Sequence, residues 1–125
     1  MSKILFVGEK RSPTARKMKV TWKDGRLAGK HLMTAIERAQ LDVENCDFMN
    51  VFREILAEDI VNETAVAIIN NFDGVVVAMG RKVEKVLKNN DIEHEFIYHP
   101  ATRGTYRNID RYCEHFKNNL NHLTN

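Results

Sequence analysis

The apolar run Val75-Val76-Val77-Ala78-Met79 constrains the fold of this chain more than any other segment. It is apolar on both faces, and such a run suits the centre of a parallel sheet that is covered on both sides. Gly80 follows the run directly and ends it. We therefore predict a central parallel strand over Gly74–Met79, with helices on either side of the sheet.

Three more segments have the pattern of short strands, and helical patterns separate them. The predicted strands are Lys3–Val7, Cys46–Met49 and Glu95–Tyr98. The predicted helices are Leu27–Gln40, Phe52–Asp59, residues 62–71, Arg81–Asn89 and a last helix that begins at Thr105 or Asn108 and ends at His122. Strands that alternate with helices form parallel sheets through right-handed crossovers. Between the first strand and the first helix lies Glu9–Arg26, which we expect to be a long loop with a functional role.

The size and composition of the chain indicate one globular domain over residues 1–125. The chain has a formal net charge of +2, and no apolar run approaches the roughly 20 residues that cross a membrane, so we expect no membrane partner. The start of the chain lacks the pattern of a signal peptide. Cys46 and Cys113 lie far apart without metal-ligand spacing. We therefore expect free thiols in a reducing cytoplasm, no metal site and no cofactor.

Basic residues are concentrated in the loop after the first strand. From Lys10 to Lys30 the only acid is Asp24, and the basic residues are Lys10, Arg11, Arg16, Lys17, Lys19, Lys23, Arg26 and Lys30. From His31 to Asp73 the balance reverses and acids predominate. The basic block indicates a site for phosphate or nucleic acid, and the competing interpretation is a solvated loop.

Ligands of parallel sheets bind beyond the carboxyl ends of the strands. That rule brings four scattered strand ends to one edge of the sheet: Gly8-Glu9, Asn50, Gly80-Arg81 and His99-Pro100. The carboxylate of Glu9 could accept a proton, position a water or stabilise a cation. The amide of Asn50 matches the edge of a nucleobase, and the imidazole of His99 could donate to a developing oxyanion.

Each of these residues also has an interpretation without function. Glu9 would then be a solvated loop acid, Asn50 the start of an Asx turn and His99 a surface residue at a strand end. At most one of the available aromatic residues is expected to stack on a base, and these are Phe48, Phe52, Tyr98 and Tyr106. The basic side chains suit phosphate contacts, and the candidates are Lys10, Arg11, Arg16, Lys17, Lys19, Arg81, Arg103 and Arg107.

The order and spacing of four short segments resemble the uracil-DNA glycosylase superfamily over most of the chain. The segments are Phe6-Val7-Gly8-Glu9, Asp47-Phe48-Met49-Asn50, Val75-Val76-Val77-Ala78-Met79-Gly80 and Tyr98-His99-Pro100-Ala101. The resemblance implies a three-layer α/β/α fold with a four-stranded parallel sheet in the order 2-1-3-4. It also implies a base pocket at the carboxyl edge. Because the chain has only two cysteines, it resembles a compact member without the four-cysteine iron–sulfur cluster.

The resemblance also implies roles for individual residues. Glu9 corresponds to the residue that handles the hydrolytic water, and His99 to the histidine that faces the base carbonyl, so these two are the candidate catalytic residues. Asn50 corresponds to the asparagine that reads the pyrimidine edge. Gly8 and Phe48, which belong to the same segments, complete the candidate base-binding residues.

These observations favour a DNA glycosylase-like enzyme that hydrolyses the N-glycosidic bond of uracil or another modified pyrimidine in DNA. A duplex substrate would have its target base flipped out of the stack first. Two alternatives remain open. One is a non-catalytic module of the same fold that binds DNA, a nucleotide or a protein, and the other is a hydrolase that acts on free nucleotides. The sequence does not determine the oligomeric state.

Overall fold

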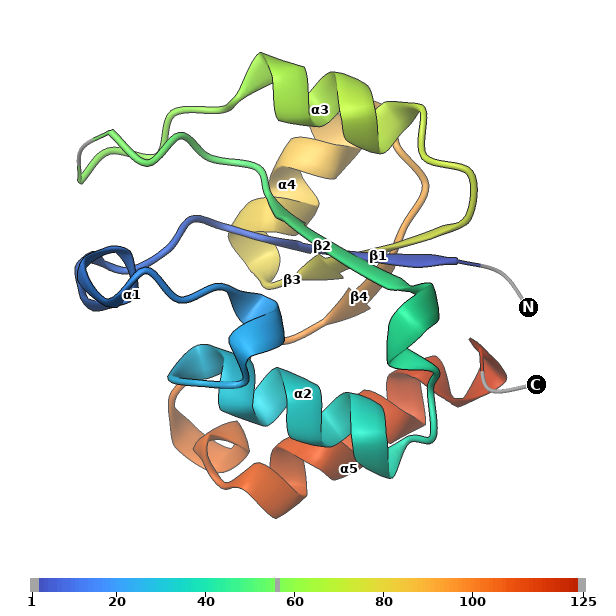
Figure 1. The fold of residues 1–125 in the computed structure, drawn as a ribbon. Coiled ribbons are helices and arrows are strands. Elements are labelled where there is room, and N and C mark those ends of the chain that lie inside the picture. Colours follow the sequence, from blue (N-terminus) through green and yellow to red (C-terminus); the bar gives the residue numbers. More distant parts are fainter. Residues whose placement is uncertain (1–2, 56, 124–125) are drawn as a thin grey trace.

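The computed structural model describes residues 3–55 and 57–123, and a four-stranded parallel sheet lies at its centre (Figure 1). The strands are β1 (Ile4–Gly8), β2 (Cys46–Asn50), β3 (Val75–Met79) and β4 (Glu95–Ile97). Their spatial order is β2-β1-β3-β4, and all three pairings are parallel. The predicted α/β class, the parallel sheet and the order 2-1-3-4 are confirmed.

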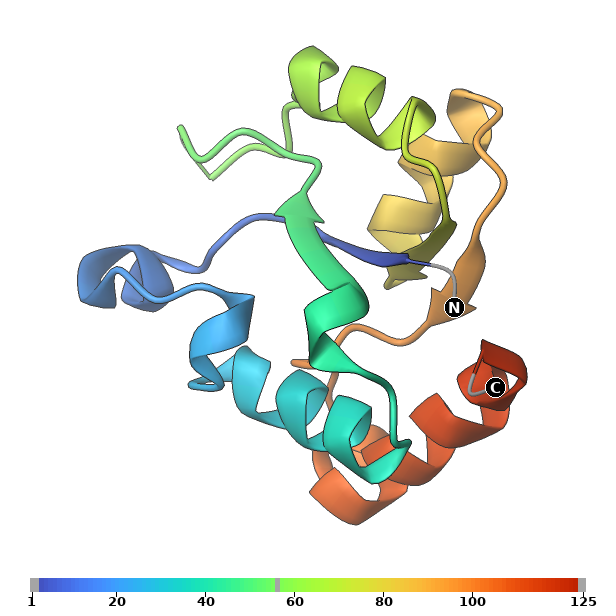
Figure 2. The same cartoon turned by 45° about the vertical axis from the view of Figure 1, so that its right-hand side comes forward.

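Two pairs of helices cover the two faces of the sheet (Figures 1 and 2). One pair is α2 (Ala28–Arg38) with α5 (Ile109–Leu120), and the other is α3 (Glu63–Asn70) with α4 (Arg81–Asn89). A fifth helix, the short α1 (Pro13–Met18), stands beside the sheet and buries none of its residues. Short 3₁₀ turns complete the described chain: η1 (Trp22–Asp24), η2 (Val43–Asn45), η3 (Gly104–Arg107) and η4 (Asn121–Leu123).

Successive side chains of a strand point to opposite faces of the sheet, and this produces one apolar cluster on each face. In β1, Phe6 packs toward α2 and α5, whereas Val7 packs toward α3 and α4. On the first side the largest buried side chain is Tyr112 of α5, whose hydroxyl donates to the backbone oxygen of Tyr98 at 2.7 Å. The hydrogen bond satisfies the buried phenol and ties α5 to the end of β4.

The predicted helix over Phe52–Asp59 is wrong. The chain leaves β2 through Phe52, which forms an antiparallel bridge with Val61, and Arg53 N–H donates to the backbone oxygen of Ile60 at 2.8 Å. Phe52 is buried, but Ile55 and Ile60 are exposed, so these residues do not share one buried face as a packed helix requires. Position 56, within the same prediction, lies outside the described residues.

The predicted loop over Glu9–Arg26 contains more structure than expected, namely α1 and η1. Ser12 caps α1 by accepting from Ala15 N–H at 3.1 Å, and Pro13 occupies the first turn, where its missing N–H costs nothing. The pair Ser12-Pro13 is a start signal for a helix, and the basic composition of the segment obscured it. The last helix begins at Ile109 with Asn108 as its cap, the second of the two predicted starting points.

Helices in the described ranges lack the combination of length and apolar composition that crossing a membrane requires.

Candidate functional site

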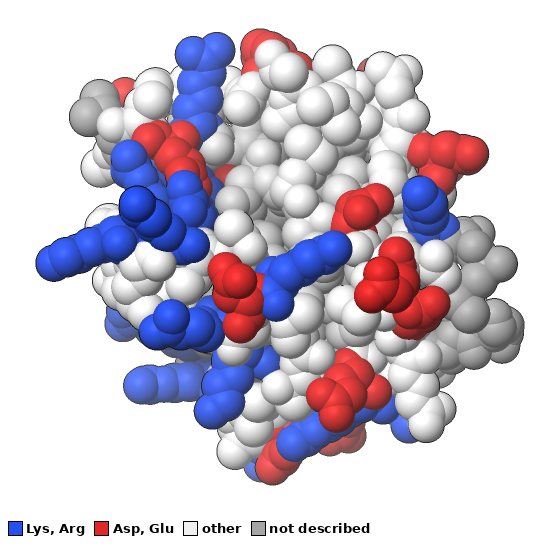
Figure 3. All heavy atoms as spheres, in the orientation of Figure 1, with Lys and Arg blue, Asp and Glu red and all other residues white. Residues whose placement is uncertain are grey.

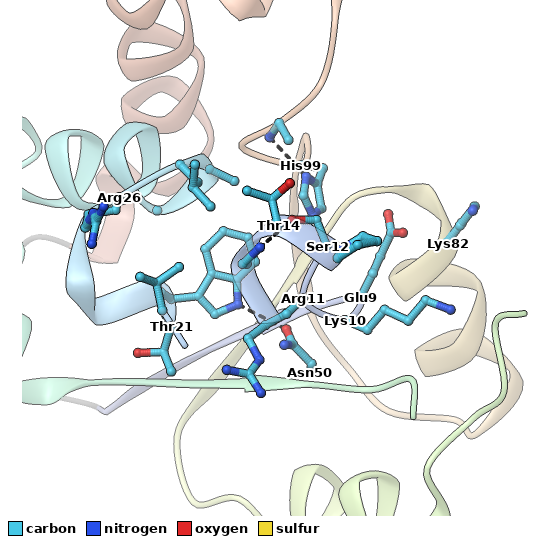
Figure 4. Close-up of a pocket in the computed structure, with 18 of the residues that line it drawn as sticks. Glu9, Lys10, Arg11, Ser12, Thr14, Thr21, Arg26, Asn50, Lys82 and His99 are labelled. Carbon is cyan, nitrogen blue, oxygen red and sulfur yellow. Dashed lines mark hydrogen bonds between the residues drawn. The ribbon is translucent and has the colours of Figure 1, made fainter. Parts of the chain in front are cut away.

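A cavity of about 620 Å³ opens at the carboxyl end of the sheet (Figure 4). The ends of three strands contribute to its wall, β1 through Glu9, β2 through Asn50 and β4 through His99. The segment from Lys10 to Gly29 forms much of the remaining wall, and Lys82 of α4 closes one side. The parallel topology therefore brings together three residues that lie far apart in the sequence.

The backbone after β4 holds His99 in one tautomer. Nδ1 of its ring accepts from the N–H of Ala101 at 3.0 Å, and its backbone oxygen accepts from the N–H of Thr102 at 2.9 Å. Since Nδ1 is an acceptor, the neutral ring carries its proton on Nε2. Burial lowers the pKa of His99, and the negative charge of Glu9 opposes that shift only in part. His99 is therefore a neutral N–H donor at neutral pH.

Asn50 is held by Trp22, a residue that sequence analysis did not identify. The indole Nε1–H donates to Asn50 Oδ1 at 3.0 Å, the bond that ends at Asn50 in Figure 4. The same indole meets the ring of His99 edge-on, with centroids 5.7 Å apart. One signal could have found it, because Trp22 is the single tryptophan of the chain and lies in the long segment expected to be functional.

Gly8 makes this arrangement possible because it has no side chain. A Cβ at this position would lie 2.7 Å from Asn50 Oδ1 and 2.8 Å from Cζ2 of Trp22. Both distances are shorter than real Cβ contacts. Gly8 therefore belongs to the site because it allows the indole and the amide to approach each other closely.

Glu9 extends from the end of β1 toward the start of α4. Gly80 is the N-cap of α4. A Cβ added to Gly80 would lie 3.8 Å from Glu9 Oε2 and 3.2 Å from the Cβ of His99, so both residues lie close to this helix start. In Figure 4 the carboxylate lies between His99 and Lys82. The pKa of Lys82 is raised, first by its hydrogen bond to Asp59 and further by the charges of Asp59 and Glu9.

Two predicted phosphate ligands are paired with acids of the segment that follows β2. Arg11 forms two side-chain hydrogen bonds of 2.8 Å with the carboxylate of Glu54, which also accepts the backbone N–H of Arg11 at 3.1 Å. Lys10 lies 3.4 Å from Asp59, and Asp59 also pairs with Lys82 at 2.9 Å. Part of the positive charge at the cavity is thus neutralised within the protein.

The other basic residues of this region remain at the surface. Arg16, Lys17 and Lys19 are exposed on α1 and at its C-cap, and they form no ion pair within 4.0 Å with any residue of 3–55 or 57–123. Figure 3 shows Lys and Arg side chains gathered on the side of the molecule where α1 lies. This basic surface borders the cavity, because Pro13, Thr14 and Ala15 of α1 line it.

Besides Arg16, Lys17 and Lys19, four more predicted site residues lie outside the cavity wall. Arg81 is exposed, with its guanidinium 4.5 Å from the ring centroid of Phe96 and 3.3 Å from Glu84. Arg103 and Arg107 are exposed around η3. Phe48 stacks on Phe6 at 5.6 Å and borders a second cavity of about 430 Å³. The structure therefore brings Gly8, Glu9, Lys10, Arg11, Asn50 and His99 together and leaves these four apart.

Within residues 3–55 and 57–123, histidine, cysteine and acidic side chains do not gather in groups of three that could hold a metal ion. The described cysteines are free and buried, and burial raises the pKa of the Cys46 thiol to about 11.

The chain matches no protein-family model, and no curated protein is significantly similar to it.

Proposed function

We propose that the cavity binds a flipped nucleobase and that the protein is a DNA glycosylase-like enzyme. Its reaction would be hydrolysis of the N-glycosidic bond of uracil or another modified pyrimidine in DNA. One observation carries this proposal: the ends of three strands place Glu9, Asn50 and His99 in the wall of a single cavity. The resemblance of the four strand-end segments to the uracil-DNA glycosylase superfamily supports the same function.

The three groups suit the charges that develop when an N-glycosidic bond breaks. The base departs with negative charge, and the sugar becomes cationic. His99 offers an Nε2–H to the departing base, and because its pKa is lowered it does so as a neutral imidazole. Glu9 offers a carboxylate, which can stabilise the cationic sugar or orient the attacking water. Asn50 offers an amide, which can pair with the edge of the base.

The surface around the cavity is suited to binding the DNA that contains the target base. The exposed cations of α1 and its C-cap, namely Arg16, Lys17 and Lys19, border the cavity and are positioned to contact phosphates. A cavity of about 620 Å³ has room for a pyrimidine that has left the base stack. Binding through these contacts would weaken as salt is added.

The test is base release from defined oligonucleotides. We expect the protein to convert oligonucleotides that carry uracil or another modified pyrimidine into abasic products, detected by alkaline cleavage. His99→Ala should lower the rate by about a hundredfold to a thousandfold, since it removes one donor to the developing anion. Asn50→Ala should lower it by at least about tenfold, because the base edge loses its partner.

A matched control is His122→Ala, which removes an exposed histidine in η4, paired with Glu95 outside the cavity wall. This variant should release base at the rate of the unaltered protein. Tight, salt-dependent DNA binding without release of any base would contradict the proposal and favour a non-catalytic binding module. Turnover of free nucleotides without action on DNA would favour a nucleotide hydrolase.

A further inference from the structure

The indole of Trp22 joins two of the groups assigned to base recognition and catalysis. Its Nε1–H bonds to Asn50 Oδ1, and its ring contacts the imidazole of His99. The turn η1 that carries it is well fixed. Thr21 N–H donates to Asp24 Oδ2 at 2.6 Å, and Gly25 closes the turn in the left-handed conformation at φ 65°. These contacts define the turn that places Trp22 in the cavity wall.

The hydrogen bond from Trp22 determines which way the amide of Asn50 points. An asparagine amide has an acceptor end and a donor end, and a half-turn of the group exchanges them. An indole N–H can only donate, so the oxygen of Asn50 must face Trp22 and Nδ2 must point away. No residue in the described part of the chain hydrogen bonds to Nδ2, so both of its protons remain for a ligand.

The orientation of this amide distinguishes two classes of pyrimidine. A 4-keto pyrimidine presents an N3–H donor beside the O4 acceptor, whereas a 4-amino pyrimidine presents an N3 acceptor beside an amino donor. An amide that turns freely can pair with either edge, because the two patterns are interchanged by the half-turn. An amide that is fixed can pair well with only one.

We propose that Trp22 is a positioning residue that sets substrate specificity by holding the Asn50 amide in a single orientation. The inference rests on the function proposed above. The indole contacts both His99 and Asn50 Oδ1, so the three side chains meet in one wall of the cavity. This wall offers the Nε2–H donor of His99, and the fixed amide of Asn50 offers an acceptor at Oδ1 and donors at Nδ2. A 2,4-diketo pyrimidine carries the complementary groups, namely carbonyl acceptors for His99 and Nδ2 and an N3–H donor for Oδ1.

The direct test removes the N–H and keeps an aromatic ring. Base release is measured for the unaltered protein and Trp22→Phe, on oligonucleotides that carry a single uracil or a single target cytosine. We expect the ratio of kcat/KM for uracil to that for cytosine to fall by at least about tenfold in the variant. If Trp22 only supports the fold, both rates fall in parallel and the ratio stays the same, which would overturn the proposal.

A second replacement separates the hydrogen bond from the packing of the ring. Substituting benzothienylalanine for Trp22 exchanges the N–H for sulfur and preserves the bicyclic shape. It should lower the selectivity as Trp22→Phe does, and retention of full selectivity would overturn the proposal. If circular dichroism shows that the Trp22→Phe variant does not fold, the protein with benzothienylalanine at position 22 replaces it in the test.

Binding of nucleosides tests the inference independently of catalysis. If no oligonucleotide releases a base, the proposed function fails, and the affinities for deoxyuridine and deoxycytidine are compared by NMR titration. A preference for deoxyuridine that is reduced by at least about tenfold in Trp22→Phe supports the role of Trp22. An unchanged preference, or no binding of either nucleoside, overturns it.

Discussion

At the scale of single residues, the site depends on a close approach that only glycine allows. Gly8 ends β1, and the Asn50 amide and the Trp22 indole both lie where its Cβ would be. The family resemblance assigned Gly8 to the base pocket through its segment, whereas the structure gives the residue a steric role. The indole could not reach the amide across a larger residue at this position.

We expect Gly8→Ala to break the contact between Trp22 and Asn50. The added methyl group would lie 2.7 Å from Oδ1 and 2.8 Å from Cζ2, so at least one side chain must move. The free energy of unfolding should fall by about 1–3 kcal/mol, as overpacking in a closed region does. Trp22 is the single tryptophan, so its fluorescence emission reports the displacement directly.

Gly104→Ala is the matched control. A Cβ there meets no atom within 4 Å, although the φ of 83° strains any residue other than glycine. This variant should lose stability through the backbone alone and leave the emission of Trp22 unchanged. An unchanged emission spectrum in Gly8→Ala would contradict the steric role assigned to Gly8.

At the scale of elements, the segment after β2 acts as a partner for the basic loop. From the sequence we predicted a helix there. For the cations of the loop we predicted either an external anionic partner or a solvated surface. Instead, Phe52 and Val61 bridge, and the acids between them approach the start of the loop. Glu54 binds Arg11, and this hydrogen bonding holds the pKa of Glu54 below its ordinary value. The pairing could not be predicted because it joins residues 43 positions apart.

We expect Glu54→Gln to strengthen DNA binding. The change releases Arg11 from a bidentate ion pair at the cavity wall, so its guanidinium becomes available to a phosphate. The slope of log K against log salt concentration should steepen by about 0.9, the value for one added phosphate contact. Fluorescence anisotropy with a labelled duplex at several salt concentrations measures it.

Glu114→Gln is the control for this experiment, since Glu114 is exposed on α5, away from the cavity wall, and the change in net charge is identical. It should leave the slope nearly unchanged. Equal slopes for the two variants would show that Arg11 does not reach phosphate even when it is released.

At the scale of the whole molecule, protonation links the site to the stability of the fold. Burial lowers the pKa of His115, whose Nε2 accepts the backbone N–H of Tyr98 at 3.0 Å, and burial also lowers the pKa of His99. Both rings are neutral in the folded protein at neutral pH. The unfolded chain takes up protons near the ordinary histidine pKa of about 6.5, so it gains stability relative to the fold below that pH.

We therefore expect the melting temperature to fall as the pH drops through the ordinary histidine pKa of about 6.5. The melting temperature should fall further as the pH drops through the ordinary pKa range of carboxyl groups, because the pKa values of Glu54, Asp59 and Glu84 are also lowered in the folded protein. On the alkaline side, burial raises the pKa of Cys46 and Cys113, so stability decreases once the pH exceeds the ordinary thiol value of about 8.5. Differential scanning calorimetry across this range gives the curve.

His115→Gln should reduce the first acid loss, because a glutamine oxygen can accept the Tyr98 N–H and does not titrate. His122→Gln, at an exposed position, should leave that loss intact. If the two variants have the same acid profile as the unaltered protein, His115 does not contribute to it.

The sequence by itself determined the elements whose signals are local and the order in which they alternate. Apolar runs and helical spacing are properties of neighbouring residues, so the four strands and α2 to α5 were found correctly. The general rule for parallel sheets then placed Glu9, Asn50 and His99 at one edge. The strand order 2-1-3-4, implied by the family resemblance, is also correct.

Only the tertiary structure decided which side chains meet at that edge. Trp22 reaches Asn50 from 28 positions away, and Arg11 reaches Glu54 from 43 positions away. No periodicity encodes such contacts, because they depend on how independently formed segments pack against one another. The same packing kept Phe48 against Phe6 and held Arg81 against Phe96, away from the cavity. Thus local patterns selected the scaffold and its functional edge, whereas long-range packing set the orientation of each group in the site.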